Sequence, residues 1–212
     1  MRKAYISILA YPETKTWLRS RGYELEEFPE GEHPYPAVSS HPDMYMTDGG
    51  GKLIMAGKDE KRRYLGYNCV FLDKYLIHNL KLTAPKVMEA ADRLGLEMIH
   101  VNQGYTKCSC AVVDGRSLIT ADEGICSVLR RYPDIDVLKI RAGHVSLPGF
   151  DYGFLGGASG RAGDTVLFNG DLDLHPDCGE IRRFIADRGL EVADFKGREL
   201  MDIGTIFTFS KE

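Results

Sequence analysis

The sequence lacks the features that mark membrane, secreted and nucleic-acid-binding proteins. No apolar run approaches the roughly 20 residues that a transmembrane helix needs. Pro12 follows the short apolar stretch 4–9, and no cleavage site of small residues is present. The formal net charge of −4 leaves no excess of Lys and Arg for a phosphate backbone. We therefore expect a cytoplasmic protein that binds neither membranes nor nucleic acid.

Cysteine pairs and clustered metal ligands are also missing. The five cysteines are odd in number and contain no C-x-x-C pair, which is typical of reduced thiols rather than of a disulfide framework or a cysteine zinc site. The glycine-rich stretch 156–160 lacks the Lys-Ser/Thr of a phosphate-binding loop and does not precede a predicted helix. We therefore expect neither a metal site nor a cofactor.

The most informative feature that is present is an internal repeat. Three segments end a helical pattern with Arg and Gly and continue into an alternating strand: 17–28 (WLRSRGYELEEF), 91–101 (ADRLGLEMIHV) and 185–195 (IADRGLEVADF). Glycine adopts the left-handed conformation that closes a helix without steric cost. We therefore predict helix C-terminal caps with positive φ at Gly22, Gly95 and Gly189.

A predicted hairpin follows each helix–strand piece. The hairpins span 43–57, 108–122 and 154–170, and each has an Asp-Gly or Gly-Asp turn between two apolar arms. The last copy has a single arm at 204–210, and the N-terminal stretch 3–9 can supply the missing one. Pairing of these two arms would close the sheets into a ring without open edges.

The number of repeats follows from their spacing. Segment 129–140 is a fourth helix–strand copy in which Pro133 ends the helix, and 60–82 holds a degenerate extra unit with 67–72 as its strand. The sequence thus predicts a single α/β domain over 1–212, a ring of about five ββαβ repeats of about 40 residues each. The alternative is an ordinary α/β sandwich in which the similarity of the segments is accidental.

This pattern resembles the pentein superfamily, in a bacterial branch. The same resemblance is carried by three sequence segments, HPDMYMTDGGGKLI, VNQGYTKCSCAVVD and LPGFDYGFLGGASG. Penteins are the α/β propellers of the guanidino-group-modifying enzymes. The resemblance covers nearly the whole chain and implies a hydrolase or amidinotransferase that acts on a guanidino C–N bond. It further implies a late cysteine nucleophile, a histidine in a middle unit, and carboxylates that bind the guanidinium group.

The catalytic part of the resemblance is incomplete. His144 in RAGHVS resembles the family histidine, although Ser146 stands where some members have a carboxylate. Segment 202–208 contains no cysteine, so the family nucleophile is missing there. Cys108 occupies the pseudo-symmetric position in another unit, where it is either a relocated nucleophile or a buried small hydrophobe.

The loops between repeat strands and hairpins should gather at one mouth of the ring. We expect His144 to lie there in one cleft with Asp43 and with Asp151 or Asp202, as a general base or as the cap of a loop carbonyl. The carboxylates and Arg141 would bind the ligand. Two further histidines, His41 in a turn and His175 at a helix start, are interpreted as structural.

Two functions remain open at this point. The first is an enzyme or binder of a small guanidino or amino-acid-like compound, with His144 and Cys108 as catalytic candidates and Asp43, Arg141, Asp151 and Asp202 as ligand-binding candidates. The second is a non-catalytic pentein scaffold for a protein partner, which the missing late cysteine favours. A deep pocket at the mouth would favour the first, and a filled channel the second.

Overall fold

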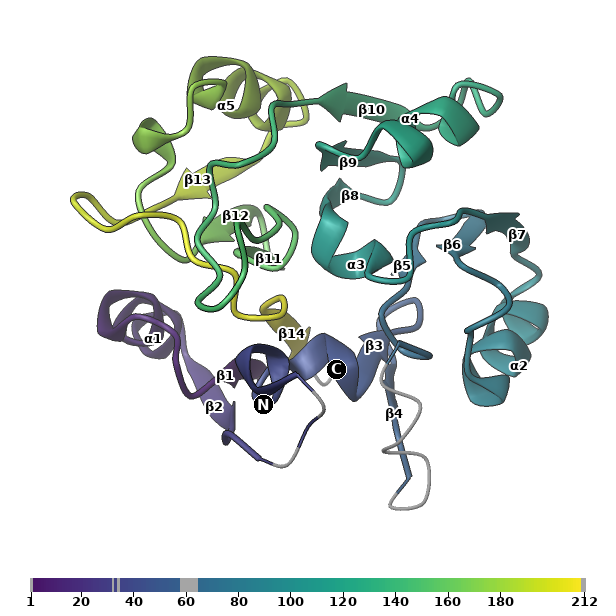
Figure 1. Ribbon diagram of the computed structural model, residues 1–212, viewed down its shortest axis with the longest axis horizontal. Helices are drawn as coiled ribbons and strands as arrows, with labels where there is room; N and C mark the ends of the chain where they lie inside the picture. Colours follow the sequence, from purple (N-terminus) through teal and green to yellow (C-terminus); the bar gives the residue numbers. More distant parts are fainter. Residues whose placement is uncertain (1, 32, 34, 58–64, 211–212) are drawn as a thin grey trace.

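The computed structural model describes residues 2–31, 33, 35–57 and 65–210. Five small sheets surround a common centre, with helices α1, α2, α4 and α5 on the outside (Figure 1). Four sheets have three strands and the fifth has two. This is the predicted ring of about five units. None of the helices in the described ranges has the length and apolar character needed to cross a membrane.

Each complete unit is a hairpin, a helix and a strand that returns parallel to the second hairpin arm. One unit contains β8 (Cys110–Asp114), β9 (Ser117–Thr120), α4 (Glu123–Leu129) and β10 (Asp136–Lys139). The next contains β11 (Ser159–Ala162), β12 (Thr165–Phe168), α5 (Cys178–Ala186) and β13 (Glu191–Ala193). The predicted helix–strand segments therefore belong to the sheet of the hairpin that precedes them.

The predicted extra unit is complete. Its elements are β5 (Val70–Phe71), β6 (Tyr75–His78), α2 (Pro85–Leu94) and β7 (Glu97–His100). Strand β5 lies within the predicted stretch 67–72, whereas the start of the predicted unit, 60–64, lies outside the described residues.

The two ends of the chain share one sheet. Strand β1 (Arg2–Ser7) pairs antiparallel with β14 (Phe207–Ser210), with Lys3 opposite Phe209. The chain then forms α1 (Pro12–Ser20), and β2 (Tyr23–Phe28) pairs parallel with β1. The predicted closure of the ring is confirmed, and the ends of the chain lie together in Figure 1.

The remaining sheet differs from the others. It consists of β3 (Met46–Asp48) and β4 (Leu53–Met55), the predicted hairpin at 43–57. Within the described part of the chain, neither a helix nor a parallel strand accompanies this hairpin. Two short 3₁₀ turns precede it instead, at Pro36–Val38 and Pro42–Met44.

The predicted positive φ is confirmed at all three glycines, whereas only Gly95 is itself the helix C-cap. Gly95 is the left-handed C-cap of α2, with φ of 68°. Gly22 and Gly189 follow the ends of α1 and α5 with φ of 79° and 68°. Each allows the chain to turn back into its strand without the Cβ clash that other residues would meet.

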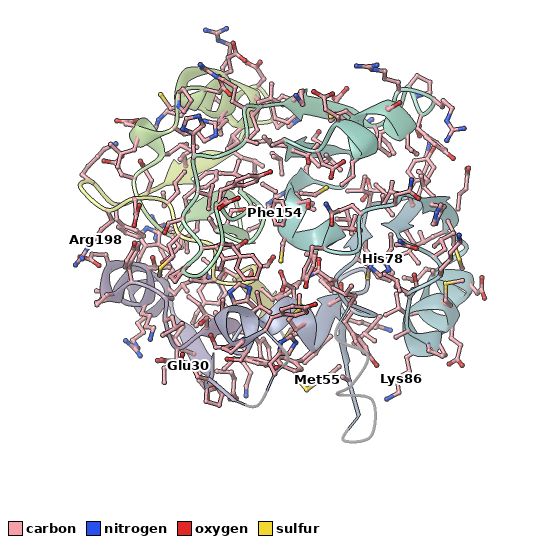
Figure 2. All side chains as sticks on the ribbon, in the orientation of Figure 1. Glu30, Met55, His78, Lys86, Phe154 and Arg198 are labelled. Carbon is pink, nitrogen blue, oxygen red and sulfur yellow. The ribbon has the colours of Figure 1, made fainter. Side chains whose placement is uncertain are left out.

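The apolar core is divided into clusters that join neighbouring units. The four longer helices each bury a side chain in a different cluster: Leu18, Val87, Ile125 and Ile181. A fifth, smaller cluster contains Val38, Met44, Cys108 and Leu147. Phe154 packs against this cluster and lies near the middle of the ring (Figure 2).

Candidate functional site

In four sheets, the residue two positions before the first hairpin strand lies beside the ring centre. These residues are Asn68, Cys108, Gly157 and Thr205, which precede β5, β8, β11 and β14. The amide nitrogen of Asn68 lies 3.3 Å from the Cys108 sulfur, and a Cβ on Gly157 would lie 1.9 Å from a carboxylate oxygen of Asp202. The pseudo-symmetry of the repeats therefore brings one position of each of these units to a common point.

Cys108 lies on the short helix α3 (Thr106–Ser109) and is 2% exposed. Its Sγ donates to Asp43 Oδ2 at 2.9 Å. The Oδ1 atom of Asn68 accepts from the backbone N–H groups of Lys107 at 2.8 Å and of Cys108 at 3.2 Å. Asn68 thus satisfies backbone donors at the start of a helix too short to pair them internally, and it fixes the position of the thiol.

Asp43 lies in the 3₁₀ turn Pro42–Met44 and is fully buried. Its Oδ2 atom accepts from the Cys108 thiol and from the Thr205 hydroxyl, both at 2.9 Å, whereas Oδ1 finds no partner among the described residues. Burial raises the pKa of the Asp43 carboxyl group, and nearby His41 only partly opposes this shift. Burial therefore favours the protonated acid more than water does.

Asp202 is the second buried acid of the site. Its two oxygens accept from the backbone N–H groups of Phe154 and Gly204, each at 3.0 Å. Burial nevertheless raises the pKa of Asp202 to about 6, because these two bonds offset only part of the desolvation. Two neighbouring carboxyl groups with raised pKa values would be ionised fully by a bound cation.

His41 lies between the two acids. Its ring is 2% exposed, and Nδ1 is 3.7 Å from Asp202 Oδ1 without a hydrogen-bond partner in the described chain. Burial lowers the pKa of His41 to about 4, so the imidazole is neutral at pH 7. Gly204 leaves room for it, since a Cβ there would lie 2.1 Å from the His41 Cβ. The interpretation of His41 as a turn residue missed this role.

Thr205 carries local strain at the site. Its φ is 66°, and it is the one non-glycine residue with positive φ within the described ranges. Such a conformation is unfavourable for a β-branched residue and tends to occur at functional sites. The Thr205 hydroxyl lies 2.9 Å from Asp43 Oδ2 and 3.2 Å from the carbonyl oxygen of Gly156. These bonds hold the strained residue against the acid.

A cavity of about 280 Å³ lies over the thiol. Its floor is polar and its walls are largely apolar and aromatic. The lining residues are Val38, His41, Tyr105, Cys108, Leu147, Phe150, Asp151, Tyr152, Phe154 and Asp202. An adjoining cavity of about 480 Å³ shares His41, Phe150 and Asp202 with it. Among the described residues, neither cavity is lined by Lys or Arg.

The structure brings four of the six predicted site residues together. Cys108, Asp151 and Asp202 line the cavity, and Asp43 bonds to the Cys108 sulfur beneath it. The prediction that His144 shares this cleft is wrong. His144 is exposed and packs edge to face with His175 at 5.2 Å. It lines a neighbouring cavity of about 170 Å³, which shares Tyr152 and Phe154 with the Cys108 cavity.

Arg141 lies with His144, outside the Cys108 cavity. Its guanidinium group forms an ion pair with Asp177, which also accepts from the Arg141 backbone N–H. Asp177 directly precedes α5, so these contacts hold the 141–144 segment against the start of that helix. The loop equivalence used in the prediction did not account for this anchor.

Three groups of the site are close enough to hold a metal ion. The ligand atoms of His41, Asp43 and Cys108 lie within 4.8 Å of one another. The sequence did not predict this set, because Cys108 is 65 positions from Asp43 and meets His41 and Asp43 only through the fold. A second acidic set, Asp171, Asp173 and Asp194, is neutralised by Lys196 and Arg182.

Comparison with solved structures finds dimethylarginine dimethylaminohydrolase. An adduct with 4-chloro-2-hydroxymethylpyridine is 11% identical, with a TM-score of 0.54 and 91% of both chains covered. A cysteine-to-serine variant from Pseudomonas aeruginosa, in complex with citrulline, is 10% identical, with a TM-score of 0.53 and the same coverage. At such identity the likeness shows the fold alone.

Sequence comparison gives the family. No curated protein sequence matches significantly. The profile of the family described as "Family of unknown function (DUF6873)" matches residues 60–207, well over half of the chain. This range contains Cys108 and Asp202, whereas His41 and Asp43 precede it. The chain therefore belongs to the DUF6873 family and adopts the pentein fold.

Proposed function

We propose that the protein binds a small guanidinium or amidinium compound in the cavity over Cys108 and hydrolyses one of its C–N bonds. The observation that carries this proposal is the meeting of one thiol and two buried acids, Asp43 and Asp202, around a single cavity. The similar solved structures support the choice of ligand class, because they include an enzyme named for dimethylarginine and its complex with citrulline, a ureido compound.

The charge of the cavity favours a cation. A planar guanidinium pairs with carboxylates through parallel hydrogen bonds, and such bonds are strongest where water is excluded. The aromatic rings of Tyr105, Tyr152 and Phe154 can pack on the faces of the cation and on an apolar tail. The bound cation would ionise Asp43 and Asp202, whose burial otherwise raises their pKa values.

The same cation would activate the thiol. In the empty site the pKa of Cys108 is well above its usual value, mainly through burial and also through Asp43. A positive charge beside the sulfur lowers a thiol pKa. Ionised Asp43, 2.9 Å away, would then accept the Sγ proton while the sulfur bonds to the central carbon of the cation.

The second half of the reaction requires a water molecule. As the C–N bond breaks, the amine leaves with the proton that Asp43 accepted. Water then adds to the sulfur-bound carbon, and the neutral imidazole of His41 takes its proton. Cleavage of the C–S bond restores the thiol, and the net reaction converts a guanidinium and water to a urea and an ammonium ion.

The lining also restricts the tail of the ligand. Arg141, a predicted ligand-binding residue, is held by Asp177 outside the cavity. Because no Lys or Arg of the described chain lines the cavity or the adjoining cavity of about 480 Å³, a carboxylate there would lie near Asp151 and Asp202 without compensation. The proposed ligand is therefore a cation with an uncharged or basic tail rather than an α-amino acid.

The test uses ligands matched in the guanidino group. Agmatine and arginine differ only in the carboxylate, so calorimetry should show agmatine binding at least about tenfold more tightly. Wild-type protein should release a urea product and ammonia, and C108S should bind without turnover. Turnover by C108S would contradict the role of the thiol. Failure of every guanidine and amidine compound to bind would contradict the proposal and leave the protein-binding scaffold as the better account.

A further inference from the structure

A larger cavity, hereafter the second cavity, lies on the other side of α3 from the Cys108 cavity. Its volume is about 530 Å³, and none of the residues that line it lines the Cys108 cavity. The consecutive residues Lys107 and Cys108 line different cavities. Thr205 lines the larger cavity while its hydroxyl contacts Asp43 beside the thiol. The two cavities therefore share a wall made of α3 and Thr205.

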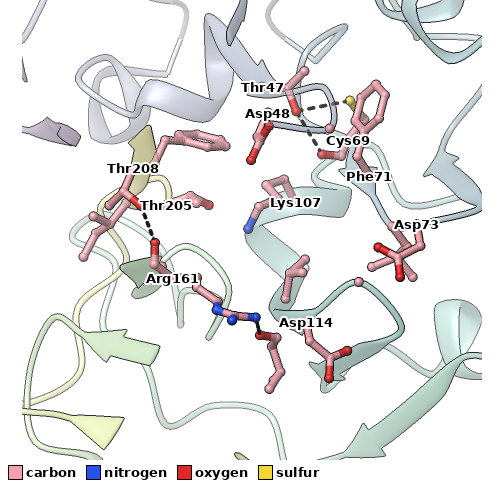
Figure 3. A pocket seen from close by; sticks show the side chains of 18 of the residues that line it. Thr47, Asp48, Cys69, Phe71, Asp73, Lys107, Asp114, Arg161, Thr205 and Thr208 are labelled. Carbon is pink, nitrogen blue, oxygen red and sulfur yellow. Dashed lines mark hydrogen bonds between the residues drawn. The ribbon is translucent and has the colours of Figure 1, made fainter. Parts of the chain in front are cut away.

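Lys107 places a charge in this second cavity. Figure 3 shows its amino group pointing into the open space between Asp48 and Arg161. The side chain is only 9% exposed, and it forms no ion pair with a described residue, although the charges of Asp43 and Asp48 act to raise its pKa. The nearest polar partner is the carbonyl oxygen of Cys110 at 3.5 Å, and the ring of Phe207 is 5.8 Å away. A buried charge with such weak partners is costly unless a ligand pairs with it.

Arg161 is less available than Lys107. Its Nη1 atom donates to the carbonyl oxygen of Val113 and its Nε atom to that of Gly163, both at 2.8 Å. These bonds fix the guanidinium group at the cavity lining. The group itself adds positive charge to the lining. Desolvation lowers the pKa of Lys107, which a paired anion would reverse.

Acidic and apolar side chains limit which anion fits. Asp48, Asp73 and Asp114 line the same cavity and disfavour a ligand with several negative charges. Asp48 is already bonded to the Gly51 N–H, and Asp114 to the Arg116 N–H, so neither is free to neutralise Lys107 fully. The remaining wall includes Phe71, Leu94, Leu96 and Phe207, which suit a short aliphatic chain.

We propose that this second cavity binds a small aliphatic monocarboxylate, whose carboxylate pairs with the amino group of Lys107 and whose chain packs on the apolar wall. The site is separate from the Cys108 cavity and does not depend on the reaction proposed there. A dicarboxylate or tricarboxylate of similar size is disfavoured by the three acids. The proposal thus predicts both the binding place, beside Lys107, and a preference for ligands with a single negative charge.

The experiment is a titration of the full chain with butyrate, in which binding is measured by calorimetry and by amide NMR shifts. Butyrate should bind, and K107M, which replaces the charge with an apolar chain of similar length, should bind at least about tenfold more weakly. The exposed Lys81 gives the matched control, K81M, which should bind as the wild type does. Citrate should bind wild-type protein at least about tenfold more weakly than butyrate.

The NMR shifts keep the proposal testable even if K107M folds poorly. Butyrate should shift the amides of Asp48, Lys107 and Thr208, which belong to the second cavity, more than those of His41 and Asp202. No binding of butyrate to the wild type, equal binding to a folded K107M, or shifts centred on His41 would each overturn the proposal.

Discussion

The complete units of the ring and the short β3–β4 unit have different roles. Each complete unit has a helix that buries an apolar residue in its own cluster, such as Ile125 in α4 or Ile181 in α5. In the described chain, the β3–β4 unit has no such helix and is preceded by 3₁₀ turns that carry His41 and Asp43. The regular units thus provide stability, whereas the irregular unit provides His41 and Asp43 at the ring centre.

The same contrast holds for individual residues at equivalent positions. Asn68, Cys108, Gly157 and Thr205 precede their hairpins by the same distance but differ in chemistry: one orients the thiol, one is the thiol, one leaves room for Asp202, and one is strained against Asp43. Repetition brings these four positions together, and the divergence of the side chains makes a site.

The largest effect should come from removing a core side chain of a complete unit. Ile125 is fully buried, so I125A should lower the free energy of unfolding by about 2–5 kcal/mol. Urea denaturation at pH 7 measures this loss. Agmatine affinity of the folded I125A protein should equal that of the wild type. A marked loss of affinity at full folding would contradict the separation of roles.

Acid should destabilise the protein through two histidines, one beside the short β3–β4 unit and one in a complete unit. His41 and His78 both have a pKa lowered to about 4 by burial, against an ordinary value of 6.5. Such a group contributes stability that is present above pH 6.5 and is lost as pH falls toward 4. Between pH 7 and 5, each should remove on the order of 2 kcal/mol.

The two histidines differ in their partners. His78 contacts Thr83 Oγ1 at 2.8 Å and the Gly104 carbonyl oxygen at 3.2 Å. Substitution of His78 removes these two bonds. His41 Nδ1 has no hydrogen-bond partner among the described residues, so H41Q should reduce the acid sensitivity with less loss of stability at pH 7 than H78Q. Asp202 acts in the opposite sense, because its raised pKa adds stability as pH falls from about 6 toward 4. Urea titrations at pH 5 and 7 would contradict this account if H41Q kept the full wild-type slope.

The smallest effect should come from a glycine at the edge of a complete unit. Gly22 has positive φ with open space around it, so G22A should cost about 1 kcal/mol of stability. Gly204 also has positive φ, but an added Cβ would collide with His41. G204A should therefore cost more and should also weaken agmatine binding. Equal thermal shifts for the two variants would show that His41 is not held as described.

Much of the ring could be predicted from the sequence, because its determinants are local. Gly22, Gly95 and Gly189 signal helix ends through backbone conformation alone, and the single arm at 204–210 predicted the pairing of β1 with β14. The site depends on contacts between residues far apart in the chain. His41 looks like a turn residue because it precedes Pro42, and its burial beside Asp202 arises from the fold.

The error on His144 has the same origin. Its loop position resembled that of a family histidine, but the contacts of Arg141 with Asp177 hold the segment near α5. No local pattern shows which of two neighbouring cavities a loop residue will enter. Cys108, by contrast, could be singled out through the repeat, since its position relative to β8 matches that of Thr205 relative to β14.

The central claim is that Cys108 is a nucleophile in a site for planar cations, and selective alkylation tests it most directly. Chloroacetamidine carries an amidinium beside its reactive carbon, and chloroacetamide is its neutral counterpart. Cys178 is the one cysteine of the chain that is not buried, so it serves as an internal reference. Peptide mass spectrometry should show chloroacetamidine modifying Cys108 first and chloroacetamide modifying Cys178 first, with D202N reducing the preference for Cys108. Faster modification of Cys178 by both reagents, or an unchanged preference in D202N, would contradict the account.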